Sequence, residues 1–217
     1  MIAELKRRSP TKGTLNDALD PRSLSALFEQ GGAVAISVLT EPVFFGGCAD
    51  DIEAVRSTVR LPVLRKDFHV HVAQLKQAQA EQASAVLLIA RALPPEDLPD
   101  LMQQARTFGL EVVVEVRSEA ELERALEAGA DIVGVNSRDL ETLEVDERVP
   151  QRLIPRIPRG VLAIWESGVA SVADVQRAAD SGADAVLVGS ALSQSSDPAG
   201  MVRSLTHVPR RRAVRNG

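Results

Sequence analysis

The stretch AVLLIARALPPEDLPDLMQQARTFGLEVVVEV, residues 85–116, decides the fold. Two short runs rich in Val, Leu and Ile, 85–91 and 111–116, flank an amphipathic segment that begins at a pair of prolines and ends at Gly109. Proline suits the first turn of a helix and glycine its end, so the stretch predicts a strand, a helix and a second strand. Strands that are apolar along their whole length are typical of a parallel sheet covered by helices.

The same alternation runs through the whole chain. Apolar runs predict eight strands, at residues 2–7, 33–39, 62–67, 85–91, 111–116, 132–137, 161–166 and 185–189. Amphipathic segments predict helices at 21–32, 50–59, 72–83, 94–109, 118–130, 149–158, 171–183 and 197–205. Eight strand–helix units favour an α/β fold of the TIM (β/α)8 barrel type with a single domain. A doubly wound open sheet is the alternative, but it usually has fewer strands.

We expect the barrel domain to span residues 1–206. Beyond it, residues 207–217 lose the apolar periodicity and contain four arginines. This composition predicts a basic, solvated tail rather than an arm that binds nucleic acid.

Composition narrows the classes of function. The 217 residues carry a net charge of -5, and 45% of them are hydrophobic, which fits a globular protein and argues against a nucleic-acid surface. No apolar run is as long as a membrane span, and the N-terminus lacks the pattern of a signal peptide. The single cysteine, Cys48, allows no internal disulfide, and the three histidines show no metal-ligand spacing. We therefore expect a cytoplasmic protein without a metal site and without a membrane partner.

Charged residues stand where the strands of a barrel should point inward. Side chains along a strand alternate between the barrel interior and the helix layer, so residues of one parity share the interior. On five predicted strands the interior set begins apolar and contains polar residues further along. These sets are Ile2, Glu4 and Lys6; Leu64, Lys66 and Phe68; Val113 and Glu115; Gly134, Asn136 and Arg138; and Leu162, Ile164 and Glu166. Their polar members fall at the C-terminal ends of the strands, where the active sites of TIM barrels form.

A single charge of this kind is equally well explained as an exposed or salt-bridged strand end. Five strands together favour a functional site, because several charges at one barrel mouth need partners when they are buried. Acid and base groups of both signs in one place are what general acid–base chemistry requires. Arg65 and Asp67 have the opposite parity to Lys66, so we expect them to form a structural pair in the helix layer.

The last two strands end in a different pattern. WESGVAS, residues 165–171, and LVGSAL, residues 187–192, place Ser-Gly and Gly-Ser directly before helical segments. Backbone N–H groups at such turns can bind an anion, and a phosphate site after strands seven and eight is frequent in TIM barrels. Each dipeptide alone is ordinary turn chemistry. Together they predict a phosphorylated small-molecule ligand.

Read together, these motifs resemble the indole-3-glycerol phosphate synthase family. The resemblance rests on IAELKRRSPTKG (2–13), ISVLTEPVFFGG (36–47), LPVLRKDF (61–68), EVVVEV (111–116), GADIVGVNSRDLETLEVD (129–146), WESGV (165–169) and ADAVLVGSAL (183–192). LRKDF and NSRDLETLEVD are the most specific of these motifs. The resemblance implies a carbon–carbon lyase of tryptophan biosynthesis that needs no cofactor. Such an enzyme closes the indole ring of 1-(2-carboxyphenylamino)-1-deoxyribulose 5-phosphate with loss of CO2 and water.

The resemblance also implies catalytic roles. Lys66 would be the general acid that protonates the ketone oxygen of the substrate, and Lys6 would hold the substrate carboxylate. Glu115 would be the acid–base partner in dehydration, while Glu4 supports Lys6 and Asn136 orients the substrate.

Further residues are implied in binding. Ser9 and Arg138 would line the mouth, Phe45 and Phe68 would form apolar walls for the anthranilate ring, and Glu166 would lie near the floor. Ser167, Gly168, Gly189 and Ser190 would hold the phosphate.

The sequence departs from the family pattern in three places. Family members usually carry an N-terminal segment with a helix that closes over the substrate, whereas Met1 here directly precedes the first strand, so we expect weakened closure and altered activity. Trp165 replaces a smaller residue, and its parity predicts that the ring faces the helix layer. His69 and His71 alter the loop after the third strand, and we expect them to be solvated or capping histidines.

Two other functions remain open at this point. One is a non-catalytic or altered-specificity protein that binds a phosphosugar. The other is a phosphoribosylanthranilate isomerase, which shares the barrel but needs an early catalytic cysteine where this chain has Glu4 and Lys6. We expect the protein to be a monomer or a weak homodimer.

Overall fold

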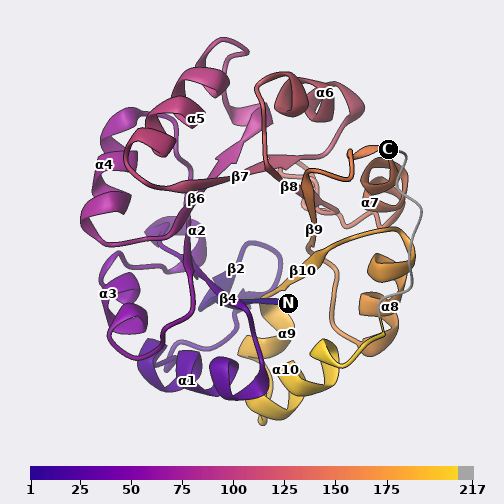
Figure 1. The fold of residues 1–217 in the computed structure, drawn as a ribbon. Coiled ribbons are helices and arrows are strands. Elements are labelled where there is room, and N and C mark those ends of the chain that lie inside the picture. Colours follow the sequence, from indigo (N-terminus) through magenta and orange to yellow (C-terminus); the bar gives the residue numbers. More distant parts are fainter. Residues whose placement is uncertain (210–217) are drawn as a thin grey trace.

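The chain forms a closed parallel barrel surrounded by helices (Figure 1). The computed structural model describes residues 1–209 of the chain. The barrel strands are β1 (Ile2–Leu5), β4 (Ala35–Leu39), β5 (Val63–Lys66), β6 (Ala85–Ile89), β7 (Glu111–Val116), β8 (Ile132–Asn136), β9 (Leu162–Glu166) and β10 (Ala185–Val188). Each strand pairs with its neighbours in the sequence, and β1 closes the ring by pairing with both β4 and β10. The predicted TIM barrel and all eight of its predicted strands are confirmed.

Helices cover the outside of the ring on every side (Figure 1). The α-helices are α1 (Pro21–Gly31), α2 (Pro42–Phe45), α3 (Asp50–Arg56), α4 (Val72–Ala80), α5 (Asp97–Thr107), α6 (Glu119–Glu127), α7 (Arg148–Leu153), α8 (Val172–Asp180), α9 (Ser190–Ser193) and α10 (Pro198–Thr206). Short 3-10 turns follow as η1 (Ala90–Ala92) and η2 (Ile154–Arg156).

The sequence signals for helix ends act as expected. The side chains of Asp20, Ser118 and Ser171 accept hydrogen bonds from free backbone N–H groups at the starts of α1, α6 and α8. Gly32 ends α1 in the left-handed conformation at φ 95°, which glycine adopts without strain.

Small elements above the barrel were not expected from the sequence. An antiparallel pair, β2 (Arg8–Ser9) and β3 (Gly13–Thr14), follows β1. The short helix α2 follows β4, and its start is capped by Glu41. These pieces are too short to give a periodic pattern, so hydrophobic spacing does not reveal them.

The apolar residues form two separate layers. The inner cluster fills the barrel with side chains of one parity: Ile2, Leu64, Leu87, Ile89, Val113, Ile164 and Leu187. A larger outer cluster lies between strands and helices. Glu4, Lys66, Glu115 and Asn136 share the parity of the inner cluster and lie above it at the C-terminal ends of their strands, as the alternation predicts.

The structure describes only part of the predicted C-terminal tail. Helix α10 ends at Thr206, and of the predicted tail at 207–217, residues 210–217 lie outside the described residues. Among residues 1–209, none of the helices has the length and apolar character needed to cross a membrane.

Trp165 belongs to the outer layer, as its parity predicts. Its side chain is 2% exposed in the outer cluster, and its Nε1 donates a hydrogen bond to Ser167 O at 3.2 Å.

We predict that Trp165→Ala lowers the free energy of unfolding by about 3 to 5 kcal/mol, because it removes a large, fully packed ring. Leu162→Ala on the same strand is the control, since Leu162 is 53% exposed, and it should change stability much less. Urea unfolding followed by far-ultraviolet circular dichroism measures both. Equal stability of the two variants would contradict the assignment of Trp165 to the core.

Candidate active site

A pocket opens at the C-terminal ends of the barrel strands. It contains about 540 Å³ of empty space, including open solvent at its mouth, a size suited to a small-molecule ligand. Its lining combines charged and apolar side chains: Glu4, Lys6, Leu39, Glu41, Phe45, Lys66, Asp67, Phe68, Leu87, Ile89, Glu115, Asn136, Arg138, Leu140 and Ser167. Nine of the residues predicted for the site therefore meet in one place.

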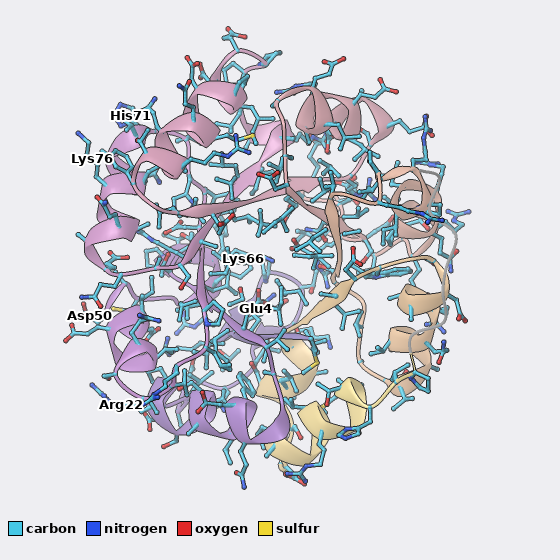
Figure 2. The ribbon with its side chains drawn as sticks, in the orientation of Figure 1. Glu4, Arg22, Asp50, Lys66, His71 and Lys76 are labelled. Atoms are coloured by element: carbon cyan, nitrogen blue, oxygen red, sulfur yellow. The ribbon has the colours of Figure 1, made fainter. Side chains whose placement is uncertain are left out.

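Lys66 lies at the centre of a cluster of charged side chains in this pocket. Its Nζ is 2.9 Å from Glu166 Oε2 and 3.4 Å from Glu4 Oε2, and Figure 2 shows Lys66 and Glu4 on the inner side of the barrel. Burial alone would lower the pKa of Lys66, but the nearby carboxylates of Glu166, Glu4 and Glu115 outweigh burial and raise the pKa. Lys66 is therefore a cation in the resting site.

Glu115 and Glu166 form a pair of carboxyls beside Lys66. Burial, followed by the charge of Glu166, raises the pKa of Glu115 to about 7, although Lys66 and a hydrogen bond with Asn136 oppose the change. Glu166 is fully buried, and its Oε1 has no hydrogen-bond partner among the described residues. A hydrogen bond with Glu166 also raises the pKa of Glu115, because two adjacent carboxyls avoid carrying two charges.

Lys6 provides a second cation near the mouth. Its Nζ is 3.9 Å from Glu4 Oε1 and 5.1 Å from the centre of the Phe45 ring. Burial lowers the pKa of Lys6, and the charges of Lys66 and Arg138 lower it further against the opposing effect of Glu4. A substrate carboxylate placed here would gain more from Lys6 than an exposed lysine could give.

Arg138 reaches the pocket from the loop after β8. Its backbone N–H donates to Asn136 Oδ1 at 2.9 Å, and its Nη1 donates to Leu143 O at 2.7 Å. The same Nη1 is 3.4 Å from Thr11 Oγ1 in the turn between β2 and β3. Arg138 thus connects two loops that border the pocket.

The two turns proposed for phosphate follow β9 and β10, which are neighbours in the barrel. Ser167 and Gly168 have φ values of 64° and 75°, and Gly189 precedes the first residue of α9, Ser190. The two turns therefore lie on the same edge of the barrel.

Five predicted site residues do not line the pocket: Ser9, Glu166, Gly168, Gly189 and Ser190. Glu166 lies beneath the lining and acts on it through Lys66. Ser9 is buried, and its Oγ is 3.1 Å from Thr11 Oγ1, so in this structure it supports the β2–β3 turn instead of the expected mouth.

Several residues of the site were not singled out from the sequence. Ser37 on β4 donates to Glu4 Oε2 at 3.3 Å from a fully buried position. Glu41 accepts hydrogen bonds from the backbone N–H groups of residues 43, 44 and 45 and so fixes Phe45. An acidic residue before a proline is a helix-start signal that could have indicated Glu41. Ser37 gives no signal beyond a polar residue in an apolar strand.

Arg65 and Asp67 form the structural pair expected from their parity. Arg65 Nη2 is 3.5 Å from Asp67 Oδ2, and Thr40 Oγ1 donates to the same oxygen at 2.5 Å. Asp67 Oδ1 also accepts from the N–H of Phe68 at 2.8 Å. This pair holds the chain directly after Lys66.

The two histidines of the next loop behave differently from each other. His71 caps α4, as expected. The expectation was wrong for His69, which is 2% exposed and lies with Nδ1 2.9 Å from Leu87 O. A carbonyl only accepts hydrogen bonds, so Nδ1 carries the hydrogen and the buried Nε2 is left without a partner. Burial lowers the pKa of His69 to about 4.

No group of three or more His, Cys, Asp or Glu side chains within residues 1–209 is arranged to hold a metal ion.

A closed parallel barrel with a buried lysine–carboxylate cluster at the C-terminal ends of its strands defines an enzyme of the TIM-barrel class. Solved structures share this fold. They include thiamine phosphate pyrophosphorylase from Pyrococcus furiosus, with a TM-score of 0.72 and 17% identity over 95% of this chain and 93% of that one. A putative lactate oxidase of Pediococcus acidilactici has a TM-score of 0.68 and 17% identity over 95% and 68%. At this identity the likeness concerns the fold alone.

Sequence comparison is more specific. A family model described as indole-3-glycerol phosphate synthase matches residues 1–205. The enzyme of that name from Parafrankia sp. (strain EAN1pec) is 49% identical over 94% of this chain and 76% of its own length. Indole-3-glycerol phosphate synthase 1 of Streptomyces coelicolor is 46% identical over 100% of this chain and 81% of its own. The chain belongs to the indole-3-glycerol phosphate synthase family, whose members are carboxy-lyases of tryptophan biosynthesis.

We predict that His69 makes the fold sensitive to acid. The unfolded chain binds a proton on His69 below pH 6.5 and the folded chain only below about 4, so its contribution is complete above pH 6.5 and is lost as the pH falls toward 4. The loss amounts to about 2 to 3 kcal/mol. Glu115 acts in the opposite direction between its ordinary pKa and 7, so the measured quantity is the difference between wild type and His69→Asn.

His69→Asn keeps a donor for Leu87 O but has no titrating group. Urea unfolding between pH 4 and 7 should show a shallower loss of stability on acidification in this variant. His71→Asn, which keeps a capping side chain in the same loop, should follow the wild type. Parallel pH profiles for wild type and His69→Asn would contradict the assignment.

Proposed function

We propose that the chain closes the indole ring of 1-(2-carboxyphenylamino)-1-deoxyribulose 5-phosphate and forms indole-3-glycerol phosphate, CO2 and water. The observation that carries the proposal is the position of Lys66. Its ammonium lies 2.9 Å and 3.4 Å from two carboxylates, in a pocket that also contains Glu115. Membership of the synthase family gives the substrate.

Lys66 is proposed to start the reaction. The ring carbon that bears the carboxylate attacks the ketone carbon, and the ketone oxygen takes up a proton as the new bond forms. Lys66 is charged in the resting site and can donate that proton. The carboxylates around Lys66 stabilise the positive charge that develops on the amino nitrogen attached to the ring in the intermediate.

Glu115 is proposed to serve the later steps. Loss of CO2 returns an electron pair to the ring, and loss of the hydroxyl group as water completes the indole. Departure of the hydroxyl needs a proton donor and removal of a ring proton needs a base. A carboxyl with a pKa of about 7 can exchange protons in both directions near neutral pH.

The remaining predicted residues are proposed to bind the substrate. Lys6, with Glu4 behind it, and Arg138 face the carboxylate end, and Asn136 orients the substrate beside Glu115. Phe45 and Phe68 supply apolar walls for the aromatic ring.

The substrate phosphate is proposed to bind at the turns after β9 and β10, at the edge of the barrel mouth. Ser167, Gly168, Gly189 and Ser190 would bind it through hydroxyl and backbone N–H groups. Ser9 is proposed to hold the β2–β3 turn beside the substrate. The proposed reaction is redox-neutral and uses only proton transfer and loss of CO2, so it requires no cofactor.

The setting of the enzyme is proposed from its composition. An acidic chain with one cysteine and a biosynthetic family fit a cytoplasmic enzyme that acts as a monomer or a weak homodimer.

The decisive experiment incubates the purified protein with the carboxyphenylamino-deoxyribulose phosphate and follows the fluorescence of the indole product. Wild type should form product, and Lys66→Ala and Glu115→Gln should each lower kcat at least 100-fold, the usual scale for a lost acid–base group. Lys76→Ala is the matched control, because Lys76 is exposed on α4 at the periphery (Figure 2). Its rate should equal that of wild type.

Two outcomes would contradict the proposal. A well-folded wild type that forms no product would favour a phosphosugar-binding protein without this activity. A Lys66→Ala variant with an unchanged rate would overturn the role of Lys66 as the proton donor.

A further inference from the structure

Glu166 is held in a position that its own contacts do not explain. Its Oε2 faces Lys66 Nζ at 2.9 Å, but the buried Oε1 has no donor in the described part of the chain. A buried carboxylate oxygen without a partner is unfavourable. Something in the barrel wall must therefore allow this conformation of the side chain.

Gly134 lies directly under that oxygen. A Cβ built at residue 134 would be 2.0 Å from Glu166 Oε1 and 3.0 Å from its Cδ. Gly134 occupies the middle of β8, where it pairs with Glu115 on β7 and with Ile164 on β9. The space of the missing side chain is thus filled by the carboxylate of the neighbouring strand.

The backbone gives no reason for a glycine at this position. Gly134 has no positive φ value, and β8 pairs on both sides without interruption. Glycine inside a strand lowers stability, and it often marks a place where another group approaches closely. Here the approaching group is the carboxylate beside Lys66.

We propose that Gly134 is a positioning residue: the absence of its side chain provides the seat that keeps the Glu166 carboxylate against Lys66 and Glu115. The proposal deepens the proposed function and rests on it for its effect on rate. A methyl group at residue 134 would push the carboxylate away from both partners. Lys66 would lose its nearest anion, and Glu115 would face less negative charge.

Gly189 shows a similar arrangement, since a Cβ there would be 2.4 Å from Glu4 Oε1. It is also one of the residues proposed to hold phosphate, so its substitution would not separate the two effects. Gly134 has no such second role, and its substitution tests the seat directly.

The test is Gly134→Ala. We expect kcat to fall at least tenfold with a smaller change in KM, because the substrate is bound by other residues. Carboxyl NMR of the free protein should show Glu115 titrating at a lower pH than in wild type. The groups that face Glu115 are Glu166, Lys66 and Asn136. Glu166 is the only carboxylate among these three groups, so its displacement should lower the pKa of Glu115.

Glu166→Asp provides the rescue. Its carboxylate is shorter by one methylene, so Gly134→Ala should cause a smaller further loss of kcat in the Glu166→Asp background than in wild type. If Gly134→Ala alone does not fold, the double variant should fold. Gly160→Ala is the control, because a Cβ at Gly160 meets no atom within 4 Å, and it should leave rate and titration unchanged.

The proposal is overturned if Gly134→Ala keeps the wild-type kcat and the wild-type titration of Glu115. Strictly additive effects of the two substitutions, or failure of both the single and the double variant to fold, would also overturn it. The titration distinguishes this proposal from the proposed function. An inactive wild type would overturn the proposed function. The change in the pKa of Glu115 in Gly134→Ala would still test whether Gly134 positions the Glu166 carboxylate.

Discussion

The structure depends on one balance of buried charge: a lysine ammonium among three glutamates at the C-terminal mouth of the barrel. Removing Lys66 from water is unfavourable by itself, and Glu4 and Glu166 at 3.4 Å and 2.9 Å make the buried cation stable. Burial of Glu115, together with repulsion from Glu166, keeps a proton on Glu115 up to about pH 7. The positive charge of Lys66 and the near-neutral pKa of Glu115 therefore both result from the same cluster.

The barrel is what allows this cluster to exist. Glu4, Lys66, Glu115 and Glu166 come from β1, β5, β7 and β9, which are far apart in the sequence and are brought together only when the sheet closes. The inner apolar layer beneath them excludes water from below, which strengthens every electrostatic interaction above it. Ser37, Gly134 and Gly189 shape the wall so that the carboxylates reach the lysine.

Much of this arrangement could be predicted from the sequence, since a period of two along eight apolar runs fixes which side chains point inward. Lys66, Glu115 and Trp165 were placed on their correct sides by this rule alone. The rule fails where position depends on contacts between elements. His69 is buried with its Nδ1 bonded to the Leu87 carbonyl of β6, and Ser37 and Glu41 contribute through the partners that they contact. The β2–β3 turn moves Ser9 away from its expected place for the same reason.

Burial beside a like charge sets the proton affinity of Glu115. Carbon-13 NMR of the glutamate side-chain carboxyls across pH 3 to 9, with Glu115 assigned from the signal lost in Glu115→Gln, measures this directly. Glu115 should titrate with an apparent pKa of about 7. Titration of Glu115 with the exposed glutamates, at about 4.3, would contradict it.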